Sequence, residues 1–220
     1  ALIGRAFAPF AEAPRWLVWK WKFVPADPKP KKVPVSPKGG ASGTNEAYAH
    51  TWTPLAEALR AARAPGIAGI GLVIPEGVVC VDLDACTVKG EVFGPLEPWA
   101  REIVERLDTF TEYSPSGTGV HVWLWGVKPG DKCRKGTVEI YAGPFKRYIT
   151  CTGRGFSRWG EAPIAERTDA LAELRTILRH REPAYRQATY HIDTEQPDAL
   201  TKLTWLVPST PRSRSRQPEF

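Results

Sequence analysis

The sequence predicts an α+β fold, because short strand patterns alternate with a few amphipathic helical patterns. Residues 78–84 read Val-Val-Cys-Val-Asp-Leu-Asp, a β-branched run that is typical of a short, buried strand. Residues 98–107 instead carry apolar side chains at helical spacing, namely Trp99, Ile103, Val104 and Leu107. The 220 residues suffice for one large domain or two small ones with a hydrophobic core.

The N-terminal part predicts a strand followed by a basic loop. Residues 15–22 alternate so that Trp19 and Trp21 share one face while Lys20 and Lys22 share the other, which predicts one buried and one solvated face. Residues 25–43 are rich in Pro, Lys and Gly, which favours an irregular loop. Its lysines contact phosphates or are simply solvated: Lys29, Lys31, Lys32 and Lys38.

Thr53 and Pro54 supply an N-cap and a proline at the first helical position, so we expect a helix that ends near Arg63. Residues 69–74 and 78–84 are then predicted to be two strands of a hairpin that turns at residues 75–77.

The second half of the sequence also alternates predicted strands with a predicted helix. Residues 109–113 and 120–125 are predicted strands on either side of a Ser/Gly-rich loop, residues 114–119. Residues 137–141 and 146–151 are predicted to form a second hairpin, and residues 166–181 a helix with one apolar stripe. Residues 208–220, rich in Ser, Arg and Pro, are predicted to be disordered.

Composition narrows the class of protein. The net charge of +6 favours an anionic partner such as nucleic acid, or reflects an arginine-rich surface. The chain has no apolar run that could cross a bilayer and no secretory signal, so we expect a cytoplasmic protein with no membrane partner. Its four cysteines form no C-x-x-C pair, which favours reduced thiols, with a zinc site assembled from scattered ligands as the alternative.

Asp82 and Asp84 are the strongest sign of chemistry. Residues i and i+2 of a strand share a face, so these two carboxylates repel each other unless a cation lies between them. Glu139 is a third acid between apolar neighbours on a predicted strand. If the three acids meet, they can hold two divalent cations, which favours in-line displacement at phosphorus.

The Ser/Gly loop is the second sign. Its glycines allow backbone N–H groups to converge, and Ser114 and Ser116 add hydroxyl groups, a combination that suits a phosphate chain. His121 on the following strand is a phosphate donor or a structural histidine. Lys146 and Arg147 neutralise triphosphate charge or form a surface salt bridge with Glu139.

Four segments together resemble the archaeo-eukaryotic primase (AEP) superfamily, especially primase-polymerases of phages, plasmids and mobile elements. The segments are Asp82-Leu83-Asp84, Ser114-Pro115-Ser116-Gly117 with Gly119-Val120-His121, Glu139-Ile140-Tyr141, and residues 147–153. The resemblance covers roughly residues 16–155. It implies an RNA-recognition-motif-like (RRM-like) antiparallel catalytic sheet with an N-terminal α/β module.

The resemblance also implies a site and its ligands. Asp82, Asp84 and Glu139 would be catalytic and would bind Mn²⁺ or Mg²⁺ in a two-metal site. Triphosphate contacts would come from Ser114, Ser116, Gly117, His121, Lys146 and Arg147. The implied partners are a single-stranded DNA template, a primer or nascent strand and an NTP or dNTP, with a helicase or C-terminal helical domain outside this chain.

The expected organisation has three parts. Residues 1–165 would form the primase-polymerase catalytic domain, divided into an N-terminal module at about 1–75 and a catalytic part at about 76–165. Residues 166–207 would form a C-terminal helix and extension, and residues 208–220 a disordered tail.

Other functions compete with this hypothesis. A rolling-circle nuclease needs two histidines around one residue, but Trp123 stands where the second would be. A glycosyltransferase also uses an Asp-x-Asp pair with Mn²⁺, and the phosphate loop, third acid and basic hairpin speak against it. A noncatalytic nucleic-acid-binding module would use the basic loop and the nine tryptophans, but would leave the three acids unexplained.

Overall fold

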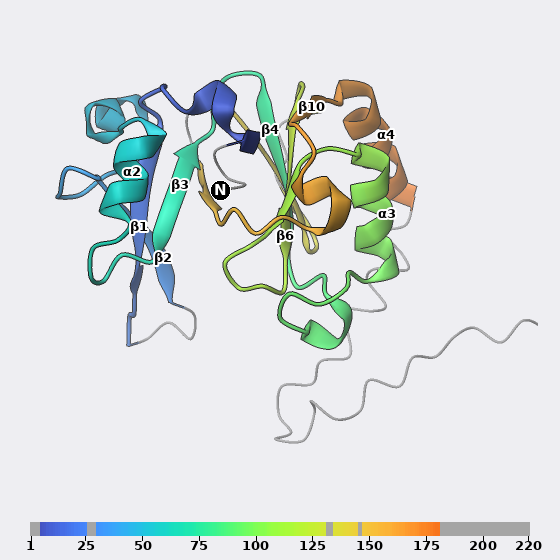
Figure 1. Ribbon diagram of the computed structural model, residues 1–220. Coiled ribbons are helices and arrows are strands. Elements are labelled where there is room, and N and C mark those ends of the chain that lie inside the picture. The colour runs from blue at the N-terminus through green and yellow to red at the C-terminus, as the bar shows by residue number, and fades with distance from the viewer. Residues whose placement is uncertain (1–4, 26–29, 131–133, 145–146, 181–220) are drawn as a thin grey trace, which may run out of the picture. The chain divides into compact units, whose positions relative to one another are not determined.

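The computed structural model describes residues 5–25, 30–130, 134–144 and 147–180. These residues combine helices with two mainly antiparallel sheets, which confirms the α+β class (Figure 1). The strands are β1 Trp16–Lys22, β2 Lys31–Val35, β3 Gly69–Val73, β4 Val78–Leu83, β5 Thr111–Tyr113, β6 Val120–Trp125, β7 Arg134–Lys135, β8 Val138–Ala142, β9 Tyr148–Cys151 and β10 Ala165–Glu166. The α-helices are α2 Leu55–Ala61, α3 Pro98–Leu107 and α4 Thr168–His180, and the 3₁₀ helices are η1 Ala8–Phe10, η2 Glu46–Thr51, η3 Val88–Gly90 and η4 Ser157–Gly160.

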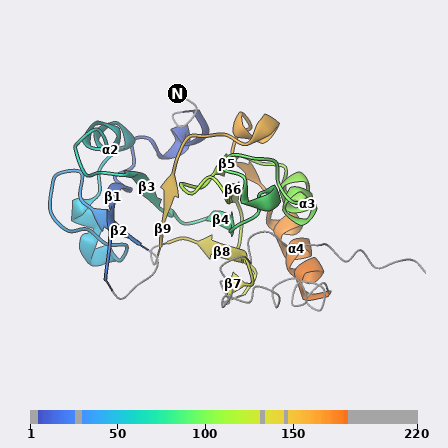
Figure 2. The same cartoon turned by 90° about the horizontal axis from the view of Figure 1, so that it is seen from below.

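The first sheet has the strand order β2-β1-β3-β9, and the second has the order β10-β6-β4-β8-β7, with β5 paired to β6. We call them sheet A and sheet B. All pairings are antiparallel except that of β10 with β6. In Figure 2, β9 lies beside β3, on the side of sheet A that approaches sheet B.

Both predicted hairpins are wrong. β3 and β4 belong to different sheets, as do β8 and β9, so each short connection carries the chain from one sheet to the other. The two crossings touch, because a Cβ atom at Gly143 would collide with the carbonyl group of Pro75. Strand pattern and loop length predicted hairpins, but the two strands on either side of each connection do not pair with each other.

The N-terminal predictions also need correction. β1 does not have one buried and one solvated face, since its first four residues are buried and its last three exposed. Part of the predicted basic loop forms β2, and Lys29 lies outside the described residues. The side chain of Thr53 does not cap α2: Pro54 occupies the N-cap position, and the backbone of Thr53 pairs with Trp16.

Other elements agree closely with prediction. α3 has the predicted bounds, and β6 begins and ends where expected. β5 and β6 lie on either side of the Ser/Gly loop, as predicted, and the structure shows that they pair with each other. Residues 181–220, which include the predicted extension and tail, lie outside the described residues. Within the described part of the chain, no helix combines the length and apolar character needed to span a lipid bilayer.

Two hydrophobic clusters use opposite faces of sheet B. Val79, Val81 and Leu83 of β4 pack with residues of α3 and α4. Val78 and Cys80, which alternate with them, join a cluster that also contains residues of sheet A and the N-terminal segment. This alternation puts Asp82 on the same face of β4 as Cys80 and Val78.

Phe7 links both sheets through edge-on aromatic contacts. Its ring centroid lies 5.5 Å from that of Trp16 on β1, 5.1 Å from that of Trp123 on β6 and 5.4 Å from that of Phe110. The side chain is fully buried.

We expect Phe7→Ala to lower the free energy of unfolding by about 3–5 kcal/mol, because it removes a buried ring and leaves a cavity. Urea denaturation measures this change. Phe23→Ala is the control, since Phe23 is 76% exposed and should change stability little. Equal effects of the two substitutions would contradict the central place given to Phe7.

Candidate active site

The site is organised by a row of four side chains that crosses sheet B. Strand register places Glu112 of β5 opposite His121 of β6, His121 opposite Asp82 of β4, and Asp82 opposite Glu139 of β8. Directly opposite residues of antiparallel strands project from the same face and lie close together. We call Glu112, His121, Asp82 and Glu139 the cross-strand row.

Burial decreases along the row. Glu112 is fully buried and the His121 side chain is 3% exposed, whereas that of Asp82 is 19% exposed and Glu139 is half-buried. His121 lies between two carboxylates: its Nε2 atom is 3.8 Å from Asp82 Oδ1, and its Nδ1 atom is 3.8 Å from Glu112 Oε1. The row therefore holds a histidine between acids at its closed end and two acids side by side at its open end.

Asp84 follows β4 and is exposed. The Ser/Gly loop lies against it: a Cβ atom at Gly119 would be 3.5 Å from Asp84 Cα and only 2.6 Å from the carbonyl oxygen of Leu83. Gly119 therefore permits an approach that a side chain would block. The structure therefore places the Ser/Gly loop beside Asp84.

The loop is held by its own hydrogen bonds. The hydroxyl groups of Ser114 and Ser116 are 3.0 Å apart, and the backbone N–H of Gly117 donates to the carbonyl of Ser114 at 2.9 Å. Gly117 adopts φ +74°, in the left-handed region that favours glycine. Ser114 is buried, whereas Ser116 is exposed.

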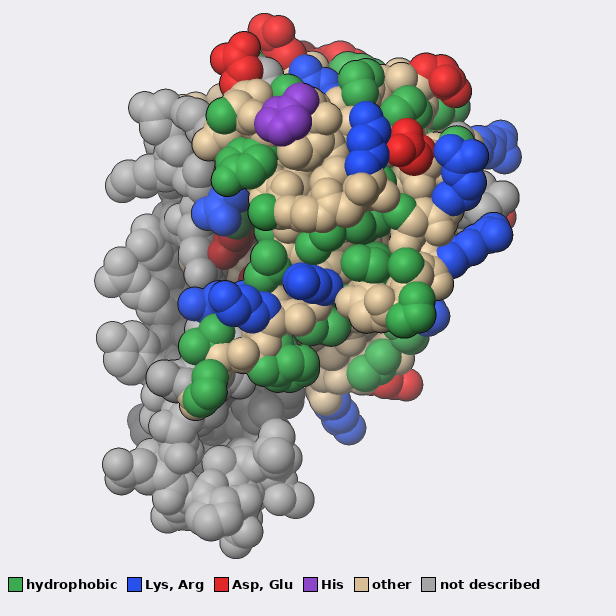
Figure 3. All heavy atoms as spheres, turned by 90° about the vertical axis from the view of Figure 1, so that its left-hand side faces the viewer, with side chains coloured by type: hydrophobic (Ala, Val, Ile, Leu, Met, Phe, Trp, Pro, Cys, Tyr) green, Lys and Arg blue, Asp and Glu red, His purple; other side chains and the backbone are tan. Residues whose placement is uncertain are grey.

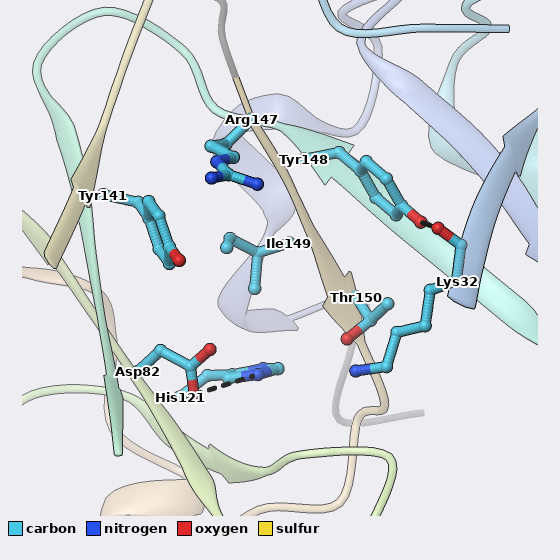
Figure 4. A pocket seen from close by; sticks show the side chains of 8 residues that line it. All are labelled: Lys32, Asp82, His121, Tyr141, Arg147, Tyr148, Ile149 and Thr150. Carbon is cyan, nitrogen blue, oxygen red and sulfur yellow. Dashed lines mark hydrogen bonds and ion pairs between the residues drawn. The ribbon is translucent and has the colours of Figure 1, made fainter. Parts of the chain in front are cut away.

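A pocket opens beside the row, with walls from both sheets (Figure 4). Asp82 and His121 lie together on one side of it, Tyr141 and Arg147 farther along, and Lys32 reaches in from β2. The complete lining is Lys32, Asp82, His121, Tyr141, Arg147, Tyr148, Ile149 and Thr150. Asp84, Glu139 and the predicted loop residues Ser114, Ser116 and Gly117 are not part of this lining.

Basic groups face the acids across the pocket. Burial lowers the pKa of Lys32, while the carboxylates of Asp82 and Asp84 act in the opposite direction, so both acids influence this ammonium group. The Arg147 guanidinium lies 5.3 Å from the centroid of the Tyr141 ring, a cation–π contact. Lys146, the other predicted basic contact, lies outside the described residues.

The carboxylates suit a hard divalent cation, because Mg²⁺ and Mn²⁺ prefer oxygen ligands. Register places two of them, Asp82 and Glu139, directly opposite each other, and Asp84 is two residues along the chain from Asp82. Across the residues that the structure describes, however, no three His, Cys, Asp or Glu side chains are grouped closely enough to hold a metal ion. The donor set therefore fits, but the three carboxylates are not gathered as ligands.

The described cysteines are buried free thiols: Cys80, Cys86 and Cys151. Burial raises the pKa of Cys86 to about 12, and it raises the pKa values of Cys80 and Cys151 as well. Thiolates are therefore disfavoured at these positions, which makes these residues poor nucleophiles. Cys133 lies outside the described residues.

The sequence left one member of the site undecided and missed another. Lys32 is predicted to lie in a loop, as a phosphate contact or a solvated lysine, whereas the structure places it on strand β2 and in the pocket lining. Glu112 received no role, although an acid in the centre of a predicted strand was the same signal that drew attention to Glu139. Its place beside His121 depends on the pairing of β5 with β6, two strands that were predicted.

Comparison with known proteins decides the family. Residues 9–157 match the family described as "Bifunctional DNA primase/polymerase, N-terminal". The chain belongs to this family. The family's name denotes nucleotidyltransferases, and membership confirms the predicted resemblance to primase-polymerases.

The chain is also similar to a protein of Nitratiruptor phage NrS-1 that is named DNA Primase-polymerase. The two are 30% identical over 150 residues, which make up 64% of this chain. The matched segment spans only 19% of the phage protein.

We expect Asp82→Asn and Asp84→Asn to change the melting temperature little when no divalent cation is present. The amide keeps the shape of the side chain and removes repulsion among the carboxylates, but it also removes attraction to Lys32, so the effects offset. Thermal denaturation at low ionic strength measures the outcome.

Thr109→Val is the matched control for a structural polar group. The Thr109 hydroxyl donates to the carbonyl of Trp123 at 2.7 Å and accepts from the N–H of Ala165 at 2.9 Å. Removal of this hydroxyl should lower the free energy of unfolding by about 1–3 kcal/mol. If the aspartate variants lost as much stability as this control, they would be structural residues.

Proposed function

We propose that this domain catalyses template-directed nucleotidyl transfer, in which a primer 3′-hydroxyl displaces pyrophosphate from the α-phosphate of an NTP or dNTP. The observation that carries the proposal is the cross-strand row, which pairs Asp82 with Glu139 on the neighbouring strand and places Asp82 and His121 in a pocket that also contains basic groups. Such a combination of charges suits a substrate that carries both a cation and phosphates. Membership of the primase/polymerase family supports the same reaction.

In this proposal Asp82, Asp84 and Glu139 hold Mg²⁺ or Mn²⁺. Their support is the shared face of β4 and β8 and the oxygen chemistry of carboxylates. When bound, such a cation supplies Lewis-acid chemistry at phosphate oxygens. The chain's own contribution is to hold Asp82 and Glu139 on two adjacent strands, with Asp84 directly after one of them, and to close one end of the row to water.

The triphosphate would lie between the acids and the basic side of the pocket. His121 and Arg147 line the pocket, and Lys32 adds a third group that can donate to phosphate oxygens. Ser114, Ser116 and Gly117 would contribute from the loop beside Asp84. Lys146 completes the proposed set, and Tyr141 offers an aromatic surface to the sugar.

The template would run along the β1–β2 side of the domain. Trp21 stands opposite Lys32 in the ladder, so the two share a face, and Trp21 is 41% exposed. An exposed indole can stack on a base of single-stranded DNA. In Figure 3, Lys and Arg side chains are scattered over the side of the protein that bears β1 and α2 rather than gathered in one patch.

The proposed organisation follows from the family. Sheet B would be the RRM-like catalytic sheet, and β1, β2 and β3 of sheet A would belong to the N-terminal module at about 1–75, within a catalytic domain at residues 1–165. The fourth strand of sheet A, β9, comes from the catalytic part at about 76–165. The helix and extension at 166–207 and the tail at 208–220 would follow. The match spans 19% of the phage protein. A helicase or a helical domain outside this chain is therefore a proposed partner and not a part of this site.

The decisive experiment is extension of a labelled primer on single-stranded DNA with nucleotides and Mn²⁺. We expect extension by the wild type and a loss of roughly 10²–10³-fold or more in Asp82→Asn, because an essential charge is removed. Glu105→Gln, an exposed acid on α3, is the control and should retain full activity.

Two results would contradict the proposal. Equal extension by the wild type and Asp82→Asn would exclude Asp82 from the mechanism. Template binding by the wild type without synthesis would favour a noncatalytic nucleic-acid-binding module instead.

A second test concerns the template. We expect Lys31→Ala with Lys38→Ala to weaken binding of single-stranded DNA and to flatten the plot of log K against log salt by about 1.4, as expected for two phosphate contacts. Fluorescence anisotropy at several salt concentrations measures the slope. Arg60→Ala with Arg63→Ala removes the same charge near the end of α2 and should leave the slope nearly unchanged, whereas an equal effect of both pairs would indicate that charge alone matters.

A further inference from the structure

Glu112 is a fully buried acid for which the proposed function has no role. It lies at the closed end of the cross-strand row, and its Oε1 atom is 3.8 Å from Nδ1 of His121. The Nδ1 atom is buried and has no hydrogen-bond partner among the described residues, and the Glu112 carboxylate faces it on that side of the ring. The other ring nitrogen faces Asp82.

The carboxylate of Glu112 accepts hydrogen bonds from three N–H groups. The indole N–H of Trp123 donates to Oε1 at 3.2 Å. The backbone N–H groups of Thr152 and Gly153 donate to Oε2 at 2.9 and 2.7 Å. The Thr152 hydroxyl lies 3.2 Å from Oε2, but its single proton has a shorter acceptor in the carbonyl of Tyr113, at 2.7 Å. Charged acceptors make stronger hydrogen bonds than neutral ones, so this network holds the side chain in one position.

These bonds connect the two sheets. Thr152 and Gly153 directly follow β9, an edge strand of sheet A, whereas Glu112 and Trp123 belong to sheet B. β9 carries Tyr148, Ile149 and Thr150, which line the pocket (Figure 4). The Glu112 carboxylate therefore anchors the end of β9, which forms one wall of the pocket. The same carboxylate also faces His121, which lies on the other wall.

We propose that Glu112 is a positioning residue: it orients the His121 ring toward the nucleotide site and docks the end of β9 onto the catalytic sheet. The role of His121 at the triphosphate belongs to the proposed function, so this part of the inference rests on it. The docking of β9 does not.

The first test is a double-mutant cycle on nucleotide affinity, measured by calorimetry with dATP and Mg²⁺. We expect Glu112→Gln to weaken affinity about 10–100-fold, as is typical when the partner of a site residue is changed. His121→Ala should weaken it at least as much. If Glu112 acts through His121, the double variant should bind dATP less than about threefold more weakly than His121→Ala alone.

Thr109→Val provides the matched control, because its buried hydroxyl bonds the backbone of the same strand without touching His121. It should lower the melting temperature but leave the affinity nearly unchanged. If the loss of affinity in the double variant equalled the product of the losses in the two single variants, Glu112 would not act through His121, and the positioning role would be overturned.

The second test is independent of nucleotide chemistry. Amide hydrogen exchange followed by NMR should become at least tenfold faster at Thr152 and Gly153 in Glu112→Gln, since both donors lose a charged acceptor. The amide of Phe156, which donates to the carbonyl of Thr111, is the internal control. Unchanged exchange at Thr152 and Gly153 would overturn the docking role.

A third variant covers the case in which Glu112→Gln does not fold. Trp123→Phe removes one donor to Oε1 and keeps the charge, and should weaken nucleotide affinity about threefold to tenfold. No effect of this substitution would also contradict the proposal. A wild-type protein that binds no dATP would refute the proposed function, whereas the exchange experiment would still decide whether Glu112 docks β9.

Discussion

The register of β4 against its two neighbours is the constraint on which the site depends. Because Asp82 pairs with His121 on one side and with Glu139 on the other, ionisable side chains from three strands share one face. A shift of one residue in either pairing would turn a member of the row to the opposite face, where Val79, Val81 and Leu83 pack against the helices. The hydrophobic core on that opposite face therefore stabilises the register that keeps the acids together.

The same row separates two environments. At its closed end, Glu112 is satisfied by donors from both sheets, which compensates the cost of burying a charge. At its open end, Asp82 and Glu139 remain partly accessible, so they keep the capacity to bind a ligand. His121 joins these environments and is the one basic member of the row. The cross-strand row thus combines a structural residue, Glu112, with the accessible acids Asp82 and Glu139.

Much of the local structure was predictable because it depends on residues close in sequence. The periodicity of α3 and the β-branched pattern of β4 correctly located these elements, and the spacing of Asp82 and Asp84 indicated an acidic site. The ordered motifs also indicated the family, which the match over residues 9–157 confirms. In contrast, the hairpin predictions failed because both connections look like turns, whereas the strands that they join lie in different sheets.

The sequence by itself determined the residue types, their spacing and the positions of most strands and helices. Only the tertiary structure decided which strands share a sheet, that Lys32 reaches the pocket, and that Glu112 stands beside His121. The physical reason is that helix periodicity and turn chemistry are local, whereas strand pairing is chosen by side-chain packing between segments far apart in the chain.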